Sequence, residues 1–323
     1  MSDREEKTGK NDNGKKNKGG KRNKIVAIEM IILVLLIMAA AAIFIQKDKS
    51  VKEAAKIHDQ KAEKTEQTSQ DAQKENEIEE ETEGTEEETG DRDEAVPDRS
   101  NFAVQPGVSV GTTEQSDEKI VYLTLDDGPS DNTQAVLDIL DKYNAKATFF
   151  VTGEMPEYKD MIKAAYDKGH TIGMHTYSHD YAKVYASVDA YFQDLDQIGQ
   201  MVQEEIGYVP CFIRFPGGSS NTVSKKYTAG IMSTLVQEVQ NRGYQYYDWN
   251  GSSGDGAVRT TEELVAQATS FDSNNIILLC HDSHGKQTTV EALPQIIEHY
   301  QSLGYTFKAL DRDSFVAHHG VNN

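Results

Sequence analysis

The stretch IVYLTLDDGP, residues 120–129, joins an apolar run of strand length to two adjacent carboxylates and a turn. A short apolar run bounded by turn residues is typical of a buried strand, and Asp, Gly and Pro are residues that turns favour. By itself, the DDGP segment is explained equally well by a turn and by a catalytic site. The preceding strand favours the catalytic site, because it directs Asp126 and Asp127 into different surroundings.

Apolar runs of strand length recur along the chain, and longer amphipathic segments lie between them. The apolar runs span residues 120–125, 147–151, 171–174, 211–213, 244–247, 276–280 and 305–307. The amphipathic segments span residues 132–143, 158–168, 185–206, 225–242, 261–271 and 290–303. This alternation favours parallel strands joined by crossover helices. We predict an α/β fold whose seven strands close into a barrel, with an open doubly wound sheet as the alternative.

The composition of the chain argues against some classes of protein. The 323 residues carry a net charge of −20, whereas nucleic-acid binding needs a basic surface. Only 37% of the residues are hydrophobic, so a good part of the chain lies outside any core. Cys211 and Cys280 both lie in apolar runs, which favours buried free thiols. A single disulfide is the alternative if the domain lies outside the cell.

The N-terminal region predicts a membrane anchor. Residues 1–24 form a polar tail that becomes basic towards its end, and residues 25–45 are apolar except for Glu29. About 20 apolar residues are needed to cross a bilayer as a helix, and Glu29 lies near the basic end, within reach of the interface. The basic tail is expected to stay inside the cell, so that the remainder lies outside. A cleavable signal peptide is the main alternative, and a buried core helix is a weaker one.

Three further regions follow the predicted anchor. We expect residues 46–115 to form a disordered acidic linker, because a glutamate-rich stretch with few large apolar side chains cannot bury enough surface to fold. Repulsion between like charges would extend this linker away from the membrane. The catalytic domain is predicted to span residues 116–310, and residues 311–323 are expected to form a C-terminal tail.

Side chains suited to catalysis or binding follow five of the predicted strands, all of them directly except His179, which lies four residues after His175. They are Asp126, Asp127, His175, His179, Arg214, Asp248, Trp249 and His281. In parallel α/β folds the active site forms at the carboxyl ends of the strands. Each residue alone has an ordinary structural explanation, although the four-residue separation of His175 and His179 is one that metal-binding histidines use. Together they predict one site at the carboxyl edge of the sheet.

Five segments, in this order, resemble the motifs of a known enzyme family. They are TLDDGP (124–129), HTYSH (175–179), RFPGG (214–218), Asp248-Trp249 and LCH (279–281). The chain from residue 118 to residue 310 resembles the polysaccharide deacetylases, which are carbohydrate esterase family 4 and carry the NodB homology domain. The resemblance implies a distorted (β/α)7 barrel and hydrolysis of an acetamido or acetyl ester group on a sugar.

The resemblance implies that Asp127, His175 and His179 hold a divalent metal, with zinc expected first and Co²⁺, Ni²⁺ or Mn²⁺ as alternatives. Three protein ligands leave positions open for water and substrate, as in catalytic metal sites. Asp126 would be the general base and His281 the general acid that protonates the leaving nitrogen.

The resemblance also implies supporting roles around these groups. Arg214 is expected to pair with Asp126, and Asp248 is expected to pair with His281 and favour its protonated form. A backbone N–H near Gly217 would help to stabilise the oxyanion. Trp249 and Leu279 are expected to form apolar walls of the substrate site.

Three positions depart from the family pattern. Gly217 stands where many members carry tyrosine, Leu125 replaces phenylalanine, and Gln245 replaces an aspartate that is often seen ahead of Asp248-Trp249. These changes leave the chemical groups in place and the substrate open. The loss of tyrosine at position 217 removes one expected wall of the substrate groove.

The leading hypothesis is an N-deacetylase of peptidoglycan amino sugars, because an anchor and a long linker would place the domain within reach of the cell wall. Chitooligosaccharides, an exopolysaccharide and acetylated xylan are alternative substrates. Two histidines and a carboxylate also bind iron in non-haem oxygenases, but those enzymes do not require Arg214 or His281 beside the triad. A catalytically silent sugar-binding relative is the third possibility, with Gly217 as its only support.

Overall fold

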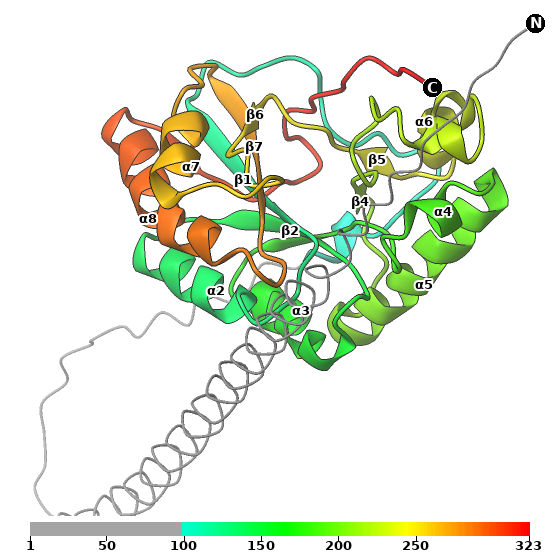
Figure 1. The fold of residues 1–323 in the computed structure, drawn as a ribbon, viewed down its shortest axis with the longest axis horizontal. Coiled ribbons are helices and arrows are strands. Elements are labelled where there is room, and N and C mark those ends of the chain that lie inside the picture. The colour runs from blue at the N-terminus through cyan, green and yellow to red at the C-terminus, as the bar shows by residue number, and fades with distance from the viewer. Residues whose placement is uncertain (1–98) are drawn as a thin grey trace, which may run out of the picture. The chain divides into compact units, whose positions relative to one another are not determined.

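The computed structural model describes residues 99–323, which fold around one sheet of parallel strands (Figure 1). The described strands are β1 (Ile120–Asp126), β2 (Ala147–Val151), β3 (Thr171–Met174), β4 (Phe212–Ile213), β5 (Gln245–Tyr246), β6 (Gly251–Ser252), β7 (Asn275–His281) and β8 (Thr306–Phe307). Seven of them match the predicted runs to within one residue at either end. The exception is β6, which was not predicted because glycine and serine carry no apolar strand signal.

Helices fall in each of the six predicted amphipathic segments. They are α2 (Thr133–Lys142), α3 (Asp160–Asp167), α5 (Val188–Ile206), α6 (Ile231–Asn241), α7 (Thr261–Ala268) and α8 (Gln287–Ser302). The short helix α4 (Tyr181–Val184) lies outside the predicted segments. The start of α5 is set by Ser187, whose side chain accepts a hydrogen bond from the Ala190 N–H, and its end by Gly207 at a φ of 88°. The predicted segment 185–206 therefore begins three residues too early.

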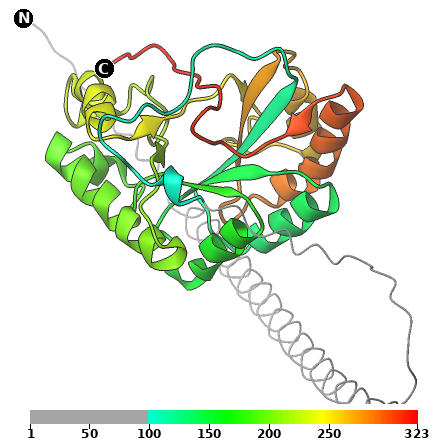
Figure 2. The same ribbon diagram turned by 180° about the vertical axis from the view of Figure 1, so that it is seen from behind.

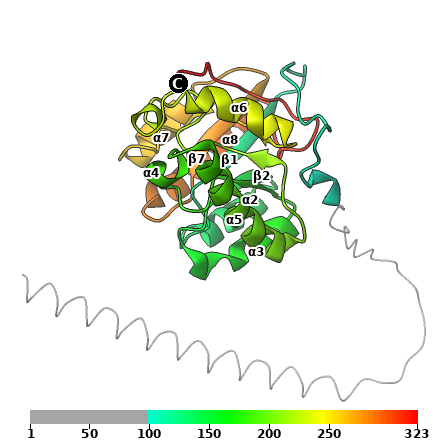
Figure 3. The ribbon, with the colours of Figure 1, turned by 90° about the vertical axis from the view of Figure 1, so that its right-hand side faces the viewer.

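The strands follow the order β5-β4-β3-β2-β1-β7-β6, and β8 pairs with β1 off this path. Every ladder between these strands is parallel, and the register places Asp126 of β1 opposite His281 of β7. Within residues 99–323 no ladder joins β5 to β6, so the sheet curls into a half-barrel that stays open there (Figures 2 and 3). The predicted distorted barrel of parallel strands is confirmed, with the difference that its strands do not close between β5 and β6.

Two apolar clusters lie on the two faces of the sheet. On the outer face, alternate residues of β1 such as Leu123 and Leu125 pack against the helices. On the concave face, the intervening residue Tyr122 packs with Phe150 and Phe212, and no residue of α2–α8 belongs to this cluster. Helices therefore cover one face only, which excludes the doubly wound alternative, in which both faces carry helices.

The concave cluster is completed by segments that the sequence had assigned to the linker and the tail. Phe102 and Val110 precede the predicted boundary at residue 116, and Phe315 and Val316 follow the predicted boundary at residue 310, yet all four are buried here. Backbone bridges join Ala103 to Pro210 and Thr112 to Phe315. Both predicted boundaries consequently lie inside the folded unit, and residues 311–323 are not a separate tail.

The structure also bears on the predictions about cysteines and membrane spans. Cys211 and Cys280 are buried free thiols, as predicted. The predicted anchor at residues 25–45, the basic tail before it and most of the predicted linker lie outside the described residues. Among residues 99–323, no helix has the length and hydropathy needed to cross a membrane.

Candidate active site

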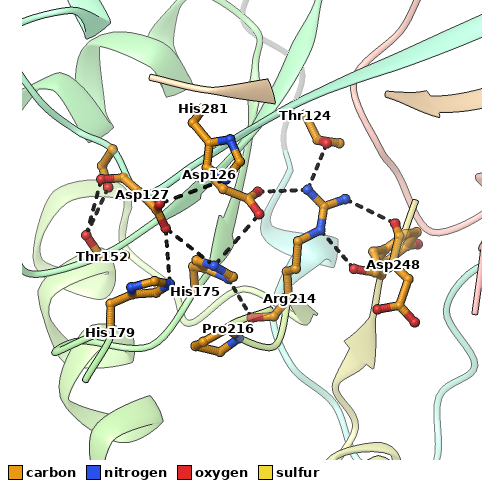
Figure 4. A network of polar contacts seen from close by, with 12 residues as sticks. Thr124, Asp126, Asp127, Thr152, His175, His179, Arg214, Pro216, Asp248 and His281 are labelled. Atoms are coloured by element: carbon orange, nitrogen blue, oxygen red, sulfur yellow. Dashed lines mark hydrogen bonds and ion pairs between the residues drawn. The ribbon is translucent and has the colours of Figure 1, made fainter. Parts of the chain in front are cut away.

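The predicted site residues lie at the carboxyl edge of the sheet, where the loops after β1, β3, β4 and β7 meet (Figure 4). Asp126 ends β1, His175 follows β3, Arg214 follows β4 and His281 ends β7. Since all these strands are parallel, their carboxyl ends share one edge and bring the four side chains together.

Asp127, His175 and His179 form a compact group of potential metal ligands. The Oδ1 atom of Asp127 lies 3.5 Å from Nε2 of His175 and 3.3 Å from Nε2 of His179. One ligand atom from each of the three residues lies within 4.8 Å of the other two. The structure thus brings together the three residues that were predicted to share one cation.

The surroundings of these side chains fit a divalent cation. The Nδ1 atom of His175 lies 2.8 Å from the Arg214 carbonyl oxygen, so this nitrogen carries the proton and Nε2 keeps its lone pair for a metal. Asp127 Oδ1 is buried and accepts no hydrogen bond from the described residues. Two imidazole nitrogens and a carboxylate are a donor set that zinc binds in catalytic sites.

Electrostatics keep both kinds of ligand in their metal-binding forms. Burial raises the pKa of Asp127, but the neighbouring His175, His179 and His281 outweigh burial and hold this pKa below its usual value. Burial lowers the pKa of His175, which favours the neutral imidazole. An ionised carboxylate and a neutral imidazole are the forms that coordinate metals.

The backbone around the ligands is held in an unusual conformation. Asp127, Thr176 and His179 have φ values of 66°, 70° and 46°, in the left-handed region that non-glycine residues rarely adopt. The carboxylate of Asp194, on α5, accepts hydrogen bonds from the Tyr177 and Ser178 N–H groups at 2.5 Å and 3.0 Å. These hydrogen bonds hold the loop between the two histidines against a long helix. Positive φ values at non-glycine residues strain the backbone, and strain of this kind is typical of functional sites.

Asp126 pairs with Arg214 beneath the ligand group. Arg214 Nη1 donates to Asp126 Oδ1 at 2.7 Å and to the Thr124 hydroxyl at 2.8 Å. Its Nε donates to the Tyr247 carbonyl, and the guanidinium lies 4.3 Å from the centre of the Phe150 ring. Asp126 Oδ2 remains directed towards the ligand group, 3.8 Å from His175 Nε2. The guanidinium fixes one carboxylate oxygen and leaves the other facing the site (Figure 4).

His281 is oriented by Asp255, and the predicted pairing of His281 with Asp248 is wrong. Asp255 Oδ1 lies 2.8 Å from His281 Nδ1, and Oδ2 accepts hydrogen bonds from the His281 N–H and the Thr289 hydroxyl. Burial lowers the pKa of His281, but its hydrogen bond to Asp255 and the charges of Asp255 and Asp126 raise this pKa to about 9. The imidazole is therefore protonated at neutral pH, with Nε2 directed at Asp127 from 3.9 Å.

Asp248 instead holds the loops behind Arg214. Its carboxylate accepts hydrogen bonds from the Ser219 N–H and hydroxyl at 2.8 Å and 2.5 Å and from the His319 N–H at 2.8 Å. Its backbone carbonyl accepts from Arg214 Nη2. Asp248 thus joins the loop after β4 to the C-terminal segment. Its link to the potential catalytic residues is the hydrogen bond from Arg214, which in turn pairs with Asp126.

The three predicted substrate-site residues lie at different depths. Gly217 has a φ of 75°, and its N–H finds no acceptor among the described residues. Trp249 is half-buried, with its ring 5.7 Å from the Arg214 guanidinium. Leu279, inside β7, is only 7% exposed, so it can offer little surface to a ligand.

Asp255 is the functional residue that sequence reasoning missed. It follows β6, whose Gly-Ser sequence gave no strand signal, and it stands in a Gly254-Asp255-Gly256 turn that reads as a surface loop. Had β6 been recognised, a carboxylate three residues after a strand would have been a candidate by the same rule that found Asp126.

The sequence of this chain is similar to those of known polysaccharide deacetylases. The sequence profile of the family described as polysaccharide deacetylase matches residues 113–236. A peptidoglycan-N-acetylglucosamine deacetylase of Bacillus cereus is 30% identical over 226 residues, which cover 65% of this chain and 78% of that protein. A chitin deacetylase of Arthroderma benhamiae is 36% identical over 54% of this chain and 46% of that protein.

A solved structure shares both the fold and much of the sequence. It is the catalytic domain of a peptidoglycan N-acetylglucosamine deacetylase from Eubacterium rectale, which superimposes with a TM-score of 0.63 at 47% identity. The match covers 65% of this chain and 97% of that domain.

Proposed function

Because this chain belongs to the polysaccharide deacetylase family and is a hydrolase of that kind, we propose that it removes N-acetyl groups from peptidoglycan amino sugars in a metal-dependent reaction. The observation that supports this proposal most is the placement of Asp127, His175 and His179 within 4.8 Å of one another, between the paired carboxylate of Asp126 and the imidazole of His281.

Asp127, His175 and His179 would hold the cation, which we propose to be zinc, with Co²⁺, Ni²⁺ or Mn²⁺ as alternatives. A cation there supplies Lewis acidity, which makes water more acidic and polarises a carbonyl oxygen. The ionised, half-buried carboxylate of Asp127 beside two histidines is suited to bind such a cation.

Asp126 and His281 are proposed to move the protons of the reaction. Asp126 accepts a proton from the attacking water as the water oxygen bonds to the acetyl carbon. His281 then donates the Nε2 proton to the sugar nitrogen as the carbon–nitrogen bond breaks, which releases acetate and a free amine. Arg214 and Asp255 hold the base and the acid in place.

The Gly217 N–H is proposed to stabilise the negative charge that develops on the acetyl oxygen. It is an unpaired donor at the same edge of the sheet, and a preorganised donor of this kind costs no rearrangement during the reaction. Trp249 is proposed to contact the sugar. For Leu279, which is nearly buried, only a marginal contact with the acetyl methyl group is proposed.

Peptidoglycan is proposed as the substrate because relatives matched over most of their length carry that activity in their names. The chitin deacetylase relative keeps chitooligosaccharides as an alternative. We also propose that residues 25–45 anchor the protein in the cell membrane, with residues 46–98 as a linker and the folded unit outside the cell. Both the anchor and the linker are inferred from the sequence.

Acetate release tests the proposed function. Purified protein loaded with Zn²⁺ is expected to release acetate from peptidoglycan, to leave free amines on the glycan, and to lose this activity on chelation. Asp127→Ala, which removes one ligand, serves as the matched inactive control. Release from chitooligosaccharides or acetylated xylan but not from peptidoglycan would change the substrate, and absence of release from all of them would overturn the proposal.

A further inference from the structure

Tyr181 stands at the edge of the ligand group without an assigned role. It begins α4, two residues after His179, and its ring lies edge-on to His179 with 5.8 Å between the ring centres. Its other neighbour is Tyr185, at 5.5 Å, which is fully buried and donates a hydrogen bond to the Pro216 carbonyl oxygen. Tyr181 is therefore held between a potential metal ligand and the loop that carries Gly217.

The phenol of Tyr181 covers Gly217. A Cβ atom added at Gly217 would lie only 2.5 Å from the Tyr181 hydroxyl oxygen and 3.4 Å from Cζ. The hydroxyl thus occupies the space that any side chain at position 217 would need. This contact places the hydroxyl next to the peptide unit whose N–H is the unpaired donor described above.

The Tyr181 hydroxyl is a neutral donor with nothing to donate to. Among residues 99–323 this hydroxyl makes no hydrogen bond, and the side chain is half-buried. A tyrosine phenol carries its proton at neutral pH. A protonated hydroxyl without a partner, placed beside His179 and over Gly217, is suited to donate to a ligand oxygen.

We propose that Tyr181 is a second hydrogen-bond donor for the acetyl oxygen of the substrate, beside the Gly217 N–H; the inference rests on the proposed deacetylase function. The Gly217 N–H and the Tyr181 O–H border one small region next to His179. A donor in this position acts on the charge that develops in the transition state more than on the neutral amide. The phenol can lie over the peptide unit of residue 217 only because glycine has no side chain there.

The test compares Tyr181→Phe with the wild-type protein. The variant keeps the ring and loses only the hydroxyl, so kcat for acetate release is expected to fall roughly 10- to 100-fold while KM changes by less than about threefold. Zinc content and melting temperature are expected to stay at wild-type values. Tyr143→Phe, at the surface end of α2, is the matched control and is expected to leave kcat unchanged.

A double-mutant cycle tests the contact itself. Gly217→Ala is expected to displace the phenol and lower kcat in the wild-type background. The φ of 75° and the Asn221 Cβ atom, 3.2 Å from an added Cβ atom, strain this substitution in both backgrounds, whereas the 2.5 Å contact with the hydroxyl exists only in the wild-type background. The loss of kcat is therefore expected to be clearly smaller in the Tyr181→Phe background. Additive effects would overturn the inference, as would a Tyr181→Phe variant with kcat within about twofold of wild type or with a change confined to KM. A wild-type protein that releases no acetate would overturn the proposed function and this role together.

Discussion

Replacing Asp126 with asparagine is expected to lower kcat for acetate release by about 10²- to 10⁴-fold, the range that general acid–base catalysis contributes. Asparagine keeps an oxygen that can accept the hydrogen bond from Arg214 Nη1, now 2.7 Å from Asp126 Oδ1, but it cannot accept a proton from water. Asp126 is not one of the three proposed metal ligands, so zinc content measured by mass spectrometry is expected to stay near that of the wild-type protein.

The stability of the Asp126→Asn variant needs its own measurement. Arg214 is fully buried, and removal of a buried counter-charge can cost about 3–5 kcal/mol. Kinetics should therefore be measured well below the melting temperature, which the fluorescence of Trp249, the only tryptophan, reports directly. Asp138→Asn on the exposed face of α2 is the matched control. Near-normal turnover of a folded, zinc-loaded Asp126→Asn protein would rule out Asp126 as the base.

Replacing Asp255 with asparagine is expected to lower kcat on the order of 10²-fold or more. Asp255 Oδ1 now holds His281 Nδ1 at 2.8 Å, and Oδ2 accepts from the His281 N–H and the Thr289 hydroxyl. If the side-chain oxygen of an asparagine accepts the hydrogen bonds from the His281 N–H and the Thr289 hydroxyl, its NH₂ group faces Nδ1 of His281. That donor disfavours the imidazolium, which is the form that protonates the leaving nitrogen.

The same variant is expected to change the pH dependence of kcat. A general acid works while it is protonated, so its contribution is present below its pKa and is lost as the pH rises through that value. Asp255 helps to raise the pKa of His281 to about 9. In Asp255→Asn this pKa falls, and the alkaline limb of the kcat profile is expected to move to lower pH.

Asp248→Asn is the informative comparison for Asp255. Asp248 contacts Ser219 and His319 rather than His281, so its replacement is expected to lower the melting temperature without moving the alkaline limb. A shift of the limb in Asp248→Asn but not in Asp255→Asn would contradict the assignment of Asp255.

Much of the fold could be predicted because its strands are apolar and regular. Residues 120–125 and 276–280 gave β1 and β7, and the side chains that directly follow them proved to be neighbours at one sheet edge. Asp127 and His175 were placed at this edge by the same rule, because parallel strands place their carboxyl ends together. His179 was added by its four-residue separation from His175, and the shared metal role of the three residues was predicted through the resemblance to a known family. The pairing of Asp126 with Arg214 was predicted only through the resemblance to a known family.

The remainder depends on contacts that local sequence does not encode. β5 and β6 are two residues each, so nothing in their sequences indicates that the barrel stays open between them. Phe102 and Phe315 lie in polar surroundings in the sequence, and only the concave face of the sheet shows why they are buried. The place of Tyr181 over Gly217 arises from the packing of α4 against the loop after β4.

Asp127, His175 and His179 are proposed to share one catalytic cation. A crystal structure of the protein soaked in Zn²⁺, with anomalous diffraction recorded at the zinc edge, tests it most directly. One strong anomalous peak is expected within bonding distance of the Asp127 carboxylate and of Nε2 of both histidines. If the protein releases acetate but its crystals hold no cation between these three side chains, or hold it elsewhere, the three residues do not form the catalytic metal site.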